Sequence, residues 1–510
     1  MLKRIPGLVL SVLLFVSLPT KTISLPRPNT RNIAIAGGIT AICSYAAYKI
    51  SKLVNNLPSR MAWDFDKISI DADTLTFENK NLTEPFLWGV ATSAYQVEGD
   101  DGASVKPYNQ WNRCEGQGIE IASKIQKPVP HLSGKACEHW ARYKEDIDLL
   151  KKLGFNAFRI SLSWGKIEPK EGVFNEDALA HYEDVCAYMI KQGIKPVLTL
   201  HHYTHPCWFE DKGGFEKEEN IDLFVNFCEK VFVRLKKYVH LWFTFNTFSG
   251  YALAGYSQAM KPPFKKEMPL AIEVLKNLLE SHVRVYHRLK QIDGSAQVGI
   301  YKNIFQLDPY FVWNPLDWLC SFIGNAISND SIYNFFKTGI FAVPISKNKY
   351  ENKHAIGALD MIGLNYYSGS YVKNFKVIPR VGCIPTYNDR YTIYPEGFYR
   401  ALLQISEQLA KPLEKIKEQA VPIYVTENGI AAKSSKDRDT FYKRYLYALS
   451  QAMKKGVDVR GYITWSLMDN YEWSLGYNVK YGICEVDFDT QERKLKSGTE
   501  LLLNVAALNR

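Results

Sequence analysis

Residues 155–164 read Phe-Asn-Ala-Phe-Arg-Ile-Ser-Leu-Ser-Trp, a β-rich run that decides the fold because a helical segment comes directly before it. In that segment apolar side chains recur with the 3.6-residue spacing of a helix, at Trp140, Tyr143, Ile147 and Leu150. Gly154 lies between the two and ends the predicted helix. The same spacing recurs before two further glycines, at Leu179, Tyr182, Cys186 and Met189 before Gly193, and at Phe441, Tyr445, Leu449 and Ala452 before Gly456. Alternation of helices with strands is typical of the α/β class.

The chain contains eight β-rich runs separated by helical segments. They are Phe86–Ala94, Phe155–Trp164, Lys195–Tyr203, His240–Phe248, Ala296–Leu307, Met361–Ser368, Pro422–Gly429 and Val459–Asn470. Apolar strands joined by helices predict a parallel sheet, and eight such strands close a (β/α)8 TIM barrel. An open doubly wound sheet also fits the alternation, but no glycine-rich phosphate turn follows the first run.

The net charge of +10 is concentrated at the amino-terminal end of the chain. Residues 1–60 contain eight basic residues and no acidic residue, so the other 450 residues carry only +2. A nucleic-acid partner is therefore not expected, because it requires a basic surface on the folded body. We divide the chain into a signal-peptide-like leader (1–24), a second apolar segment with a linker (25–80) and the barrel (81–510).

The leader contains two apolar stretches. Ile5–Leu18 follows two basic residues and is short for a membrane span, which indicates a secretory signal peptide. Ile33–Tyr48 is interrupted by two glycines, and we interpret it as a short anchor, an interfacial helix or a tether. Export or membrane association through residues 5–52 is expected, and an extension without any targeting role is the alternative.

The longest predicted connection, residues 309–360, is rich in aromatic side chains. These are Trp313, Trp318, Phe322, Tyr333, Phe335 and Phe336. We interpret the segment as a helix packed on the barrel, with a membrane-facing patch as the alternative.

The nine cysteines show no CxxC pair and no metal-type spacing. Cys186, Cys228 and Cys320 lie inside apolar stretches. Buried free thiols are therefore favoured over a disulfide framework.

Polar and aromatic side chains follow the predicted strands at the end where barrels of this kind hold their sites. They include Gln96, Glu98, Arg159, Trp164, His201, His202, Tyr203, Asn246, Thr247, Asn365, Tyr366, Tyr367, Glu427, Asn428, Trp465, Asp469, Asn470, Glu472 and Trp473. Amides and carboxylates bind hydroxyl groups, and indole rings stack on the C–H face of a sugar. The set predicts a site for a neutral polyhydroxy ligand, without a cofactor.

The histidines at 201, 202 and 205 also allow a zinc interpretation. On a strand, however, His201 and His205 share a face while His202 points the other way, and no CxxC or HExxH pattern accompanies them. We expect no metal and interpret one histidine as a donor to a sugar hydroxyl.

The chain resembles glycoside hydrolase family 1, the β-glucosidase-like retaining enzymes, over roughly residues 82–500. The resemblance rests on five long motifs in the family's order: Phe86-Leu-Trp-Gly-Val-Ala-Thr-Ser-Ala-Tyr-Gln-Val-Glu-Gly, Phe158-Arg-Ile-Ser-Leu-Ser-Trp, Asp360-Met-Ile-Gly-Leu-Asn-Tyr-Tyr, Tyr424-Val-Thr-Glu-Asn-Gly and Trp465-Ser-Leu-Met-Asp-Asn-Tyr-Glu-Trp. It implies a (β/α)8 barrel that hydrolyses O-glycosyl bonds in small gluco- or galacto-configured β-glycosides or oligosaccharides.

The resemblance also implies roles for individual residues. Glu427 matches the nucleophile, and Arg159 and Tyr367 match the residues that keep it ionised and oriented. The residues that match the sugar-binding positions are Gln96, His202, Asn246, Glu472 and Trp473, with Trp465 as the stacking platform. A carboxylate beside an arginine is suited to attack the anomeric carbon.

One departure from the family concerns the second carboxyl group that a retaining glycosidase uses as acid and then as base. The family has this group on the fourth strand in an Asn-Glu-Pro motif, whereas this chain reads Asn246-Thr247-Phe248. A threonine hydroxyl does not supply a proton near neutral pH. Tyr203, where the family usually has tryptophan, is a milder departure.

Three interpretations follow from the threonine. The first is an active β-glycosidase that uses another carboxylate or substrates with good leaving groups, as related thioglucosidases without this acid do. The second is a transglycosylase, and the third is a non-catalytic carbohydrate-binding protein. The carboxylates considered as substitutes are Glu98, Glu168, Glu210 and Asp211.

Overall fold

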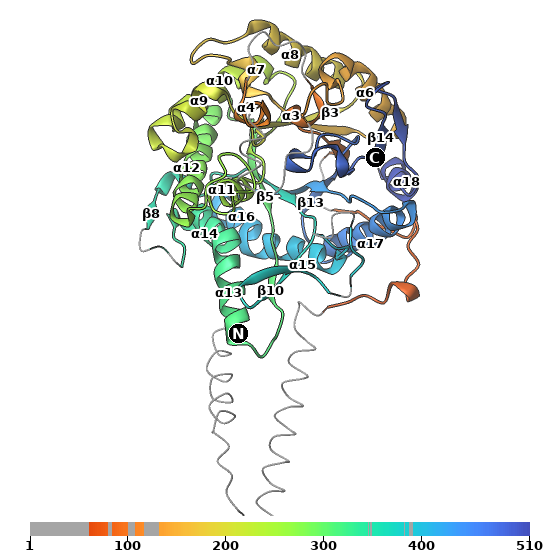
Figure 1. The fold of residues 1–510 in the computed structure, drawn as a ribbon. Coiled ribbons are helices and arrows are strands. Elements are labelled where there is room, and N and C mark those ends of the chain that lie inside the picture. The colour runs from red at the N-terminus through yellow and green to blue at the C-terminus, as the bar shows by residue number, and fades with distance from the viewer. Residues whose placement is uncertain are drawn as a thin grey trace, which may run out of the picture.

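The computed structural model describes residues 61–79, 84–99, 108–116, 132–344, 346, 349–381, 383–386 and 391–509. At its centre is a closed barrel of eight parallel strands, surrounded by helices (Figure 1). The strands are β1 (Leu87–Ala91), β2 (Ala157–Ser161), β3 (Lys195–His201), β4 (Leu241–Phe245), β5 (Gln297–Asn303), β9 (Met361–Asn365), β12 (Ile423–Asn428) and β13 (Val459–Trp465). They follow one another around the barrel in chain order, and β13 pairs with β1 to close it. The predicted TIM barrel is confirmed.

The three helices with the clearest apolar spacing form where they are predicted. They are α6 (His139–Leu153), α8 (Glu176–Lys191) and α17 (Ser435–Lys454). Gly154 ends α6 in the left-handed conformation, with φ of 89°, and its N–H bonds back to the last turn. Asn175 begins α8, because its side chain accepts hydrogen bonds from the N–H groups of Asp177 and Ala178.

The apolar core has two layers, as in other closed barrels. The larger layer lies between the strands and the helices, which also include α10 (Ile221–Leu235), α12 (Met268–Ile292), α15 (Pro395–Ile405) and α18 (Glu500–Leu508). The smaller layer fills the barrel itself, with Leu87, Val197, Leu241, Phe243, Tyr301, Met361 and Ile463 among its members. Close packing inside the barrel leaves its two ends as the places for a ligand.

The predicted strands extend too far at their carboxyl ends. β3 ends at His201 and β4 at Phe245, because Tyr203 and Thr247 turn the chain with left-handed φ angles of 65° and 37°. The run Ala296–Leu307 is wrong as a single strand. It divides into β5 and a separate strand β6 (Leu307–Pro309), which pairs with β10 (Ser370–Lys373) outside the barrel.

The aromatic connection only partly matches its interpretation as a helix packed on the barrel. Helix α14 (Ser331–Thr338) buries Tyr333, Phe335 and Phe336. Helix α13 (Pro315–Asn325) instead lies on the small outer sheet formed by β6, β10 and β11 (Lys376–Pro379), with Phe322 exposed.

None of the eight described cysteines is in a disulfide, and Cys186 and Cys228 are buried, as predicted. Cys320 is only half-buried, because it lies on α13 at the surface. The predictions for the leader fall on residues outside the described part of the chain. Within the described part, no helix is both long enough and apolar enough to cross a bilayer.

Candidate active site

The carboxylate of Glu427 lies at the carboxyl end of β12 and is held by two hydrogen-bond donors. Its Oε1 atom accepts a hydrogen bond from Nη1 of Arg159 at 2.7 Å, and its Oε2 atom accepts one from the hydroxyl of Tyr367 at 2.8 Å. Arg159 comes from β2, and Tyr367 follows β9. Side chains from three strands thus converge on one buried carboxylate.

Arg159 is fully buried, and every side of its guanidinium is occupied. It also donates to the backbone oxygen of Thr426 at 2.9 Å and to Oδ1 of Asn246 at 2.8 Å. The ring of Tyr301, from β5, lies 3.9 Å from its central carbon. Burial opposes the charge, but Tyr301 and Glu427 outweigh it and raise the pKa of Arg159. The guanidinium therefore gives the site a permanent positive charge beside Glu427.

Asn246 orients the imidazole of His202. Its Oδ1 atom accepts hydrogen bonds from Arg159 and from Nδ2 of Asn365, the latter at 2.8 Å, so its Nδ2 group is the one that faces Nε2 of His202 at 2.8 Å. Burial, with Arg159 and Lys261 nearby, holds the pKa of His202 well below its usual value. A neutral ring that accepts at Nε2 carries its proton on Nδ1. That atom is buried without a partner among the described residues, so it can donate to a ligand.

The loop after β13 brings Glu472 beside Gln96. The amide of Gln96, on the short helix α3 (Ala94–Val97), donates to Oδ1 of Asn470 and the backbone oxygen of Tyr471, both at 3.0 Å, and to Oε2 of Glu472 at 3.2 Å. The pKa of Glu472 is raised to about 7, mainly by burial. The positive charge of Lys261 opposes this increase, and the negative charge of Glu427 adds to it. The carboxyl groups of Glu472 and Glu427 therefore interact electrostatically.

The two predicted tryptophans form an aromatic wall with His202. Trp465 is the last residue of β13, and its ring centroid lies 5.9 Å from that of His202. The ring of Trp473 stacks on His202 at 6.0 Å and on Tyr95 at 5.9 Å. These aromatic side chains therefore lie at the same end of the barrel as Glu427. Other predicted strand-end residues do not join the site, since Trp164 and Tyr366 pack in the outer apolar layer and Asp469 pairs with Lys496 at 2.5 Å.

Thr247 immediately follows Asn246 and begins helix α11 (Phe248–Tyr256). Its hydroxyl is hydrogen-bonded to the hydroxyl of Tyr203. The Nζ atom of Lys261 lies 3.5 Å from the centre of the Tyr203 ring and 5.2 Å from that of Trp473. The corner of the site next to Asn246 thus contains two hydroxyls and an ammonium group.

The sequence interpretation missed Lys261 and Tyr301. Tyr301 lies near the carboxyl end of β5, and the predicted run Ala296–Leu307 extends past it, so the sequence places the strand end at Leu307 instead of at Asn303. Lys261 comes from the connection between α11 and α12, where nothing in the sequence distinguishes it from the neighbouring Lys265 and Lys266. Only the folded chain brings it over Tyr203.

The four carboxylates considered as substitute acids are bound to other partners. Glu98 accepts from the hydroxyl of Tyr182 at 2.6 Å, and Glu168 accepts from the indole of Trp164 at 2.7 Å. The remaining two are Glu210, which contacts His205 at 2.7 Å, and Asp211, which pairs with Arg113 and is exposed. His205 also faces His201 at 3.3 Å, so the ring of His205 lies between His201 and Glu210.

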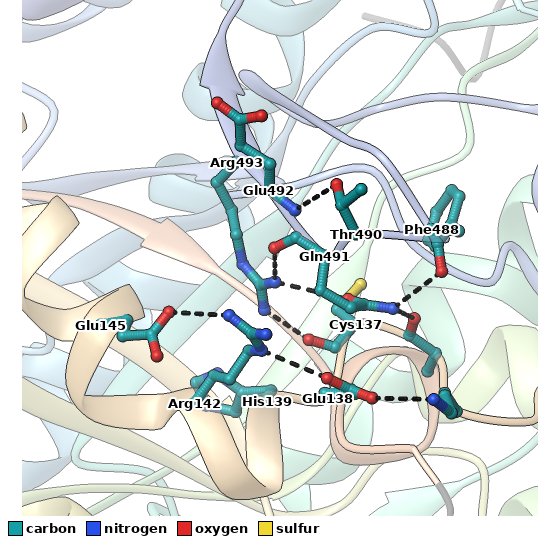
Figure 2. Close-up of polar contacts among 12 residues, drawn as sticks. Cys137, Glu138, His139, Arg142, Glu145, Phe488, Thr490, Gln491, Glu492 and Arg493 are labelled. Atoms are coloured by element: carbon teal, nitrogen blue, oxygen red, sulfur yellow. Dashed lines mark hydrogen bonds and ion pairs between the residues drawn. The ribbon is translucent and has the colours of Figure 1, made fainter.

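A polar network links Arg493 and Gln491 to the start of α6, around Cys137 (Figure 2). Arg493 donates to the backbone oxygen of Cys137 and, at 2.9 Å, to Asp146. The thiol of Cys137 in turn contacts the backbone oxygen of Asp469 at 3.1 Å, within the loop. The network therefore ties the loop after β13 to the start of α6.

A buried, charge-paired carboxylate surrounded by amides, a histidine and indoles at the mouth of a (β/α)8 barrel defines a carbohydrate-active enzyme. Residues 78–510 match Glycosyl hydrolase family 1, and the chain belongs to this family. It is a retaining β-glycosidase that acts on O-glycosyl compounds.

The chain matches several β-glycosidases over almost their whole length. Beta-glucosidase A of Acetivibrio thermocellus is 30% identical over 448 residues, which cover 81% of this chain and 95% of that protein. The beta-glycosidase from Pyrococcus horikoshii superposes with a TM-score of 0.72 at 34% identity, covering 84% of this chain and 96% of that one. The family 1 b-glucosidase from Thermotoga maritima gives a TM-score of 0.73 at 26% identity, covering 84% and 99%.

Proposed function

We propose that the chain cleaves β-glycosides through a covalent glycosyl-enzyme on Glu427, with a weakened acid/base step because Thr247 stands where the family has glutamate. The observation that carries this proposal is the contrast between the two positions. Glu427 is held by Arg159 at 2.7 Å and Tyr367 at 2.8 Å, whereas Thr247 offers only a hydroxyl shared with Tyr203.

The first step of this reaction forms the bond between the Glu427 carboxylate and the anomeric carbon and breaks the bond to the leaving oxygen. The guanidinium of Arg159 and the hydroxyl of Tyr367 orient the attacking oxygens. The neutral Nδ1–H of His202, the amide of Gln96 and the carboxyl of Glu472 are the groups suited to bind sugar hydroxyls. Without a proton donor, the leaving group departs as an anion, so its acidity sets the rate.

The second step transfers the sugar from Glu427 to water. A missing base slows the attack of water, since general base catalysis typically contributes about 10²–10⁴-fold. The glycosyl-enzyme then accumulates when its formation is fast. An added acceptor can intercept it, which is why transglycosylation is an expected side reaction.

The test is pre-steady-state kinetics with a dinitrophenyl β-glucoside or β-galactoside. We expect a burst of one dinitrophenolate per protein molecule, followed by slow turnover, and a hexose adduct on the peptide that contains Glu427. Folded protein that binds the sugar saturably but gives neither burst nor adduct would instead be a carbohydrate-binding protein.

A further inference from the structure

Helix α13 and the neighbouring β10–β11 hairpin, outside the active site, expose a group of large apolar side chains. We call it the docking face, and it consists of Trp313, Leu316, Leu319 and Phe322 on or next to α13, and Phe375 and Val377 on the β10–β11 hairpin. The exposed fractions of Trp313, Phe322 and Phe375 are 63%, 61% and 71%. Exposed apolar patches of this kind mark interaction sites on soluble domains.

The helix and the hairpin present one face because Asp317 joins them. This buried carboxylate accepts hydrogen bonds from the backbone N–H of Phe311 at 3.1 Å and from that of Asn374 at 2.9 Å. The tip of the hairpin is therefore fixed beside the first turn of α13, and both lie at the lower edge of the fold in Figure 1. Asp317 is the only charged residue of α13, so the exposed side of the helix carries no charge.

Phe375 occupies a position that its own side chain disfavours. The tight turn between β10 and β11 consists of Asn374 and Phe375, with left-handed φ angles of 47° and 66°. Such a turn favours asparagine and glycine, and a bulky residue with positive φ is an outlier. The phenylalanine ring is mostly exposed and so gains little from the fold, which indicates that its role lies in a contact outside the chain.

The hairpin of the docking face carries two lysines. Lys373 and Lys376 flank the turn of the hairpin, and residues 370–381 contain no acidic residue. The remaining basic residue of this segment, Arg380, is buried and paired with Asp308, so it adds no charge to the surface. The Nζ atom of Lys373 lies 4.5 Å from the centre of the Tyr310 ring, at the edge of the face. Aromatic and leucine side chains bordered by lysines are typical of surfaces that enter the headgroup region of a bilayer. A second copy of the chain would bring the same lysines toward each other.

The described chain begins against a helix that contacts the outer sheet of the docking face. The backbone N–H of Trp63, near the first described residue, donates to Glu396 of α15 at 2.9 Å, and its ring packs on Tyr399. Arg400 of the same helix donates to Asp308 of β6, the strand next to β10, at 3.0 Å. The 60 residues before this point hold both apolar stretches and eight basic residues.

From these observations we propose that the docking face lies in the headgroup region of a phospholipid bilayer, on the same membrane to which the leader attaches. The rings of Trp313, Phe322 and Phe375 enter the boundary of the acyl chains, and Lys373 and Lys376 contact lipid phosphates. The barrel is then held in one orientation rather than tethered loosely by its leader.

The test uses the full chain with vesicles of about three parts phosphatidylcholine to one part phosphatidylserine, with bromine on the acyl chains of the phosphatidylcholine. We expect bromine to quench the fluorescence of Trp313. The loss of tryptophan fluorescence on binding to the vesicles should therefore be larger in the wild type than in Trp313→Phe. Equal quenching in the two proteins, with both bound to the vesicles, would overturn the proposal, because the leader alone would then explain the binding.

A second comparison measures the fraction of protein bound to vesicles after flotation. The variant Leu319→Ser/Phe322→Ser/Phe375→Ser should bind about tenfold more weakly than the wild type, since it loses three interfacial apolar side chains. The matched control is Val173→Ser/Val233→Ser/Leu508→Ser, which removes similarly exposed side chains elsewhere and should bind like the wild type. Equal losses in both variants, or a wild-type dimer in lipid-free solution that the first variant abolishes, would contradict a bilayer as the partner.

Discussion

The hydroxyl groups of Tyr203 and Thr247 are hydrogen-bonded to each other beside Asn246, at the mouth of the barrel. Burial raises the pKa of Tyr203, so the pair offers no group that gives up a proton near neutral pH. In contrast, the carboxylate of Glu427 on β12 accepts hydrogen bonds from two donors. The site thus holds an oriented nucleophile for bond formation to the sugar, but the Tyr203–Thr247 pair supplies no proton to the leaving group.

The first prediction concerns Thr247→Glu. A carboxyl group at this position should raise kcat/KM for unactivated alkyl β-glycosides by about 10²-fold or more, because it restores acid and base catalysis. Steady-state kinetics with a methyl and a dinitrophenyl glycoside measure the effect. Thr247→Gln is the matched control, since it has the same size without the acid. An equal gain in both variants would assign the effect to shape.

The second prediction concerns the orientation of the nucleophile. Tyr367→Phe removes the hydrogen bond to Oε2 of Glu427 and should lower kcat/KM for an activated aryl glycoside about 10- to 100-fold, as expected for a bond to a charged group. Tyr238→Phe, at a half-buried position in the turn after α10, should leave the rate unchanged. Full activity in Tyr367→Phe would exclude a role for this hydroxyl.

The third prediction is a pH dependence of stability that originates at Glu472. The folded chain keeps this carboxyl protonated up to about pH 7, whereas a free glutamate ionises near 4.5. The free energy of unfolding therefore decreases as pH rises from about 4.5 to about 7, because ionising the carboxyl opposes folding. Glu472→Gln lacks this contribution and should gain stability relative to the wild type across this window.

Urea unfolding of both proteins between pH 4.5 and 8 measures this difference. The exposed Glu485→Gln serves as the control and should follow the wild type at every pH. A difference between Glu472→Gln and the wild type that does not change with pH would show that the Glu472 carboxyl does not titrate in this range. Lys261→Met should extend the window at its upper limit to higher pH, because Lys261 lowers the pKa of Glu472 in the folded chain.

The fourth prediction concerns the polar network around Cys137 (Figure 2). Arg493→Ala leaves the buried Asp146 with only His139 as a partner and should lower the free energy of unfolding by about 3 kcal/mol. Arg142→Ala is the comparison, because Arg142 lies on α6 like Asp146. It removes more exposed ion pairs to Glu138 and Glu145 and should lower the free energy of unfolding by less than about 1 kcal/mol. Similar losses in the two variants, measured by urea unfolding, would contradict this difference.

The barrel could be predicted because its strands and helices are local patterns. Gly154 and the spacing of Tyr143, Ile147 and Leu150 define α6 without any tertiary information. The strand ends could not be predicted in the same way. β4 stops at Phe245 because the chain turns at Thr247, and nothing in the local sequence requires that turn.

The residues of the site could be predicted largely through family motifs, whereas their mutual contacts could not. The position of Lys261 over Tyr203 depends on how the connection after α11 folds back. The raised pKa of Glu472 depends on the packing of the loop after β13, which Asp146 and Arg493 support from outside the barrel. These contacts join segments more than fifty residues apart in sequence.

The central claim, a retained nucleophile without its acid/base partner, is tested most directly by adding azide to the wild-type protein during turnover of a dinitrophenyl β-glycoside. Azide is a small anion that attacks the glycosyl-enzyme without a general base. We predict that it accelerates steady-state turnover and yields the β-configured glycosyl azide, and that Thr247→Glu shows no such acceleration. Turnover that azide leaves unchanged, with only free sugar as product, would contradict the claim.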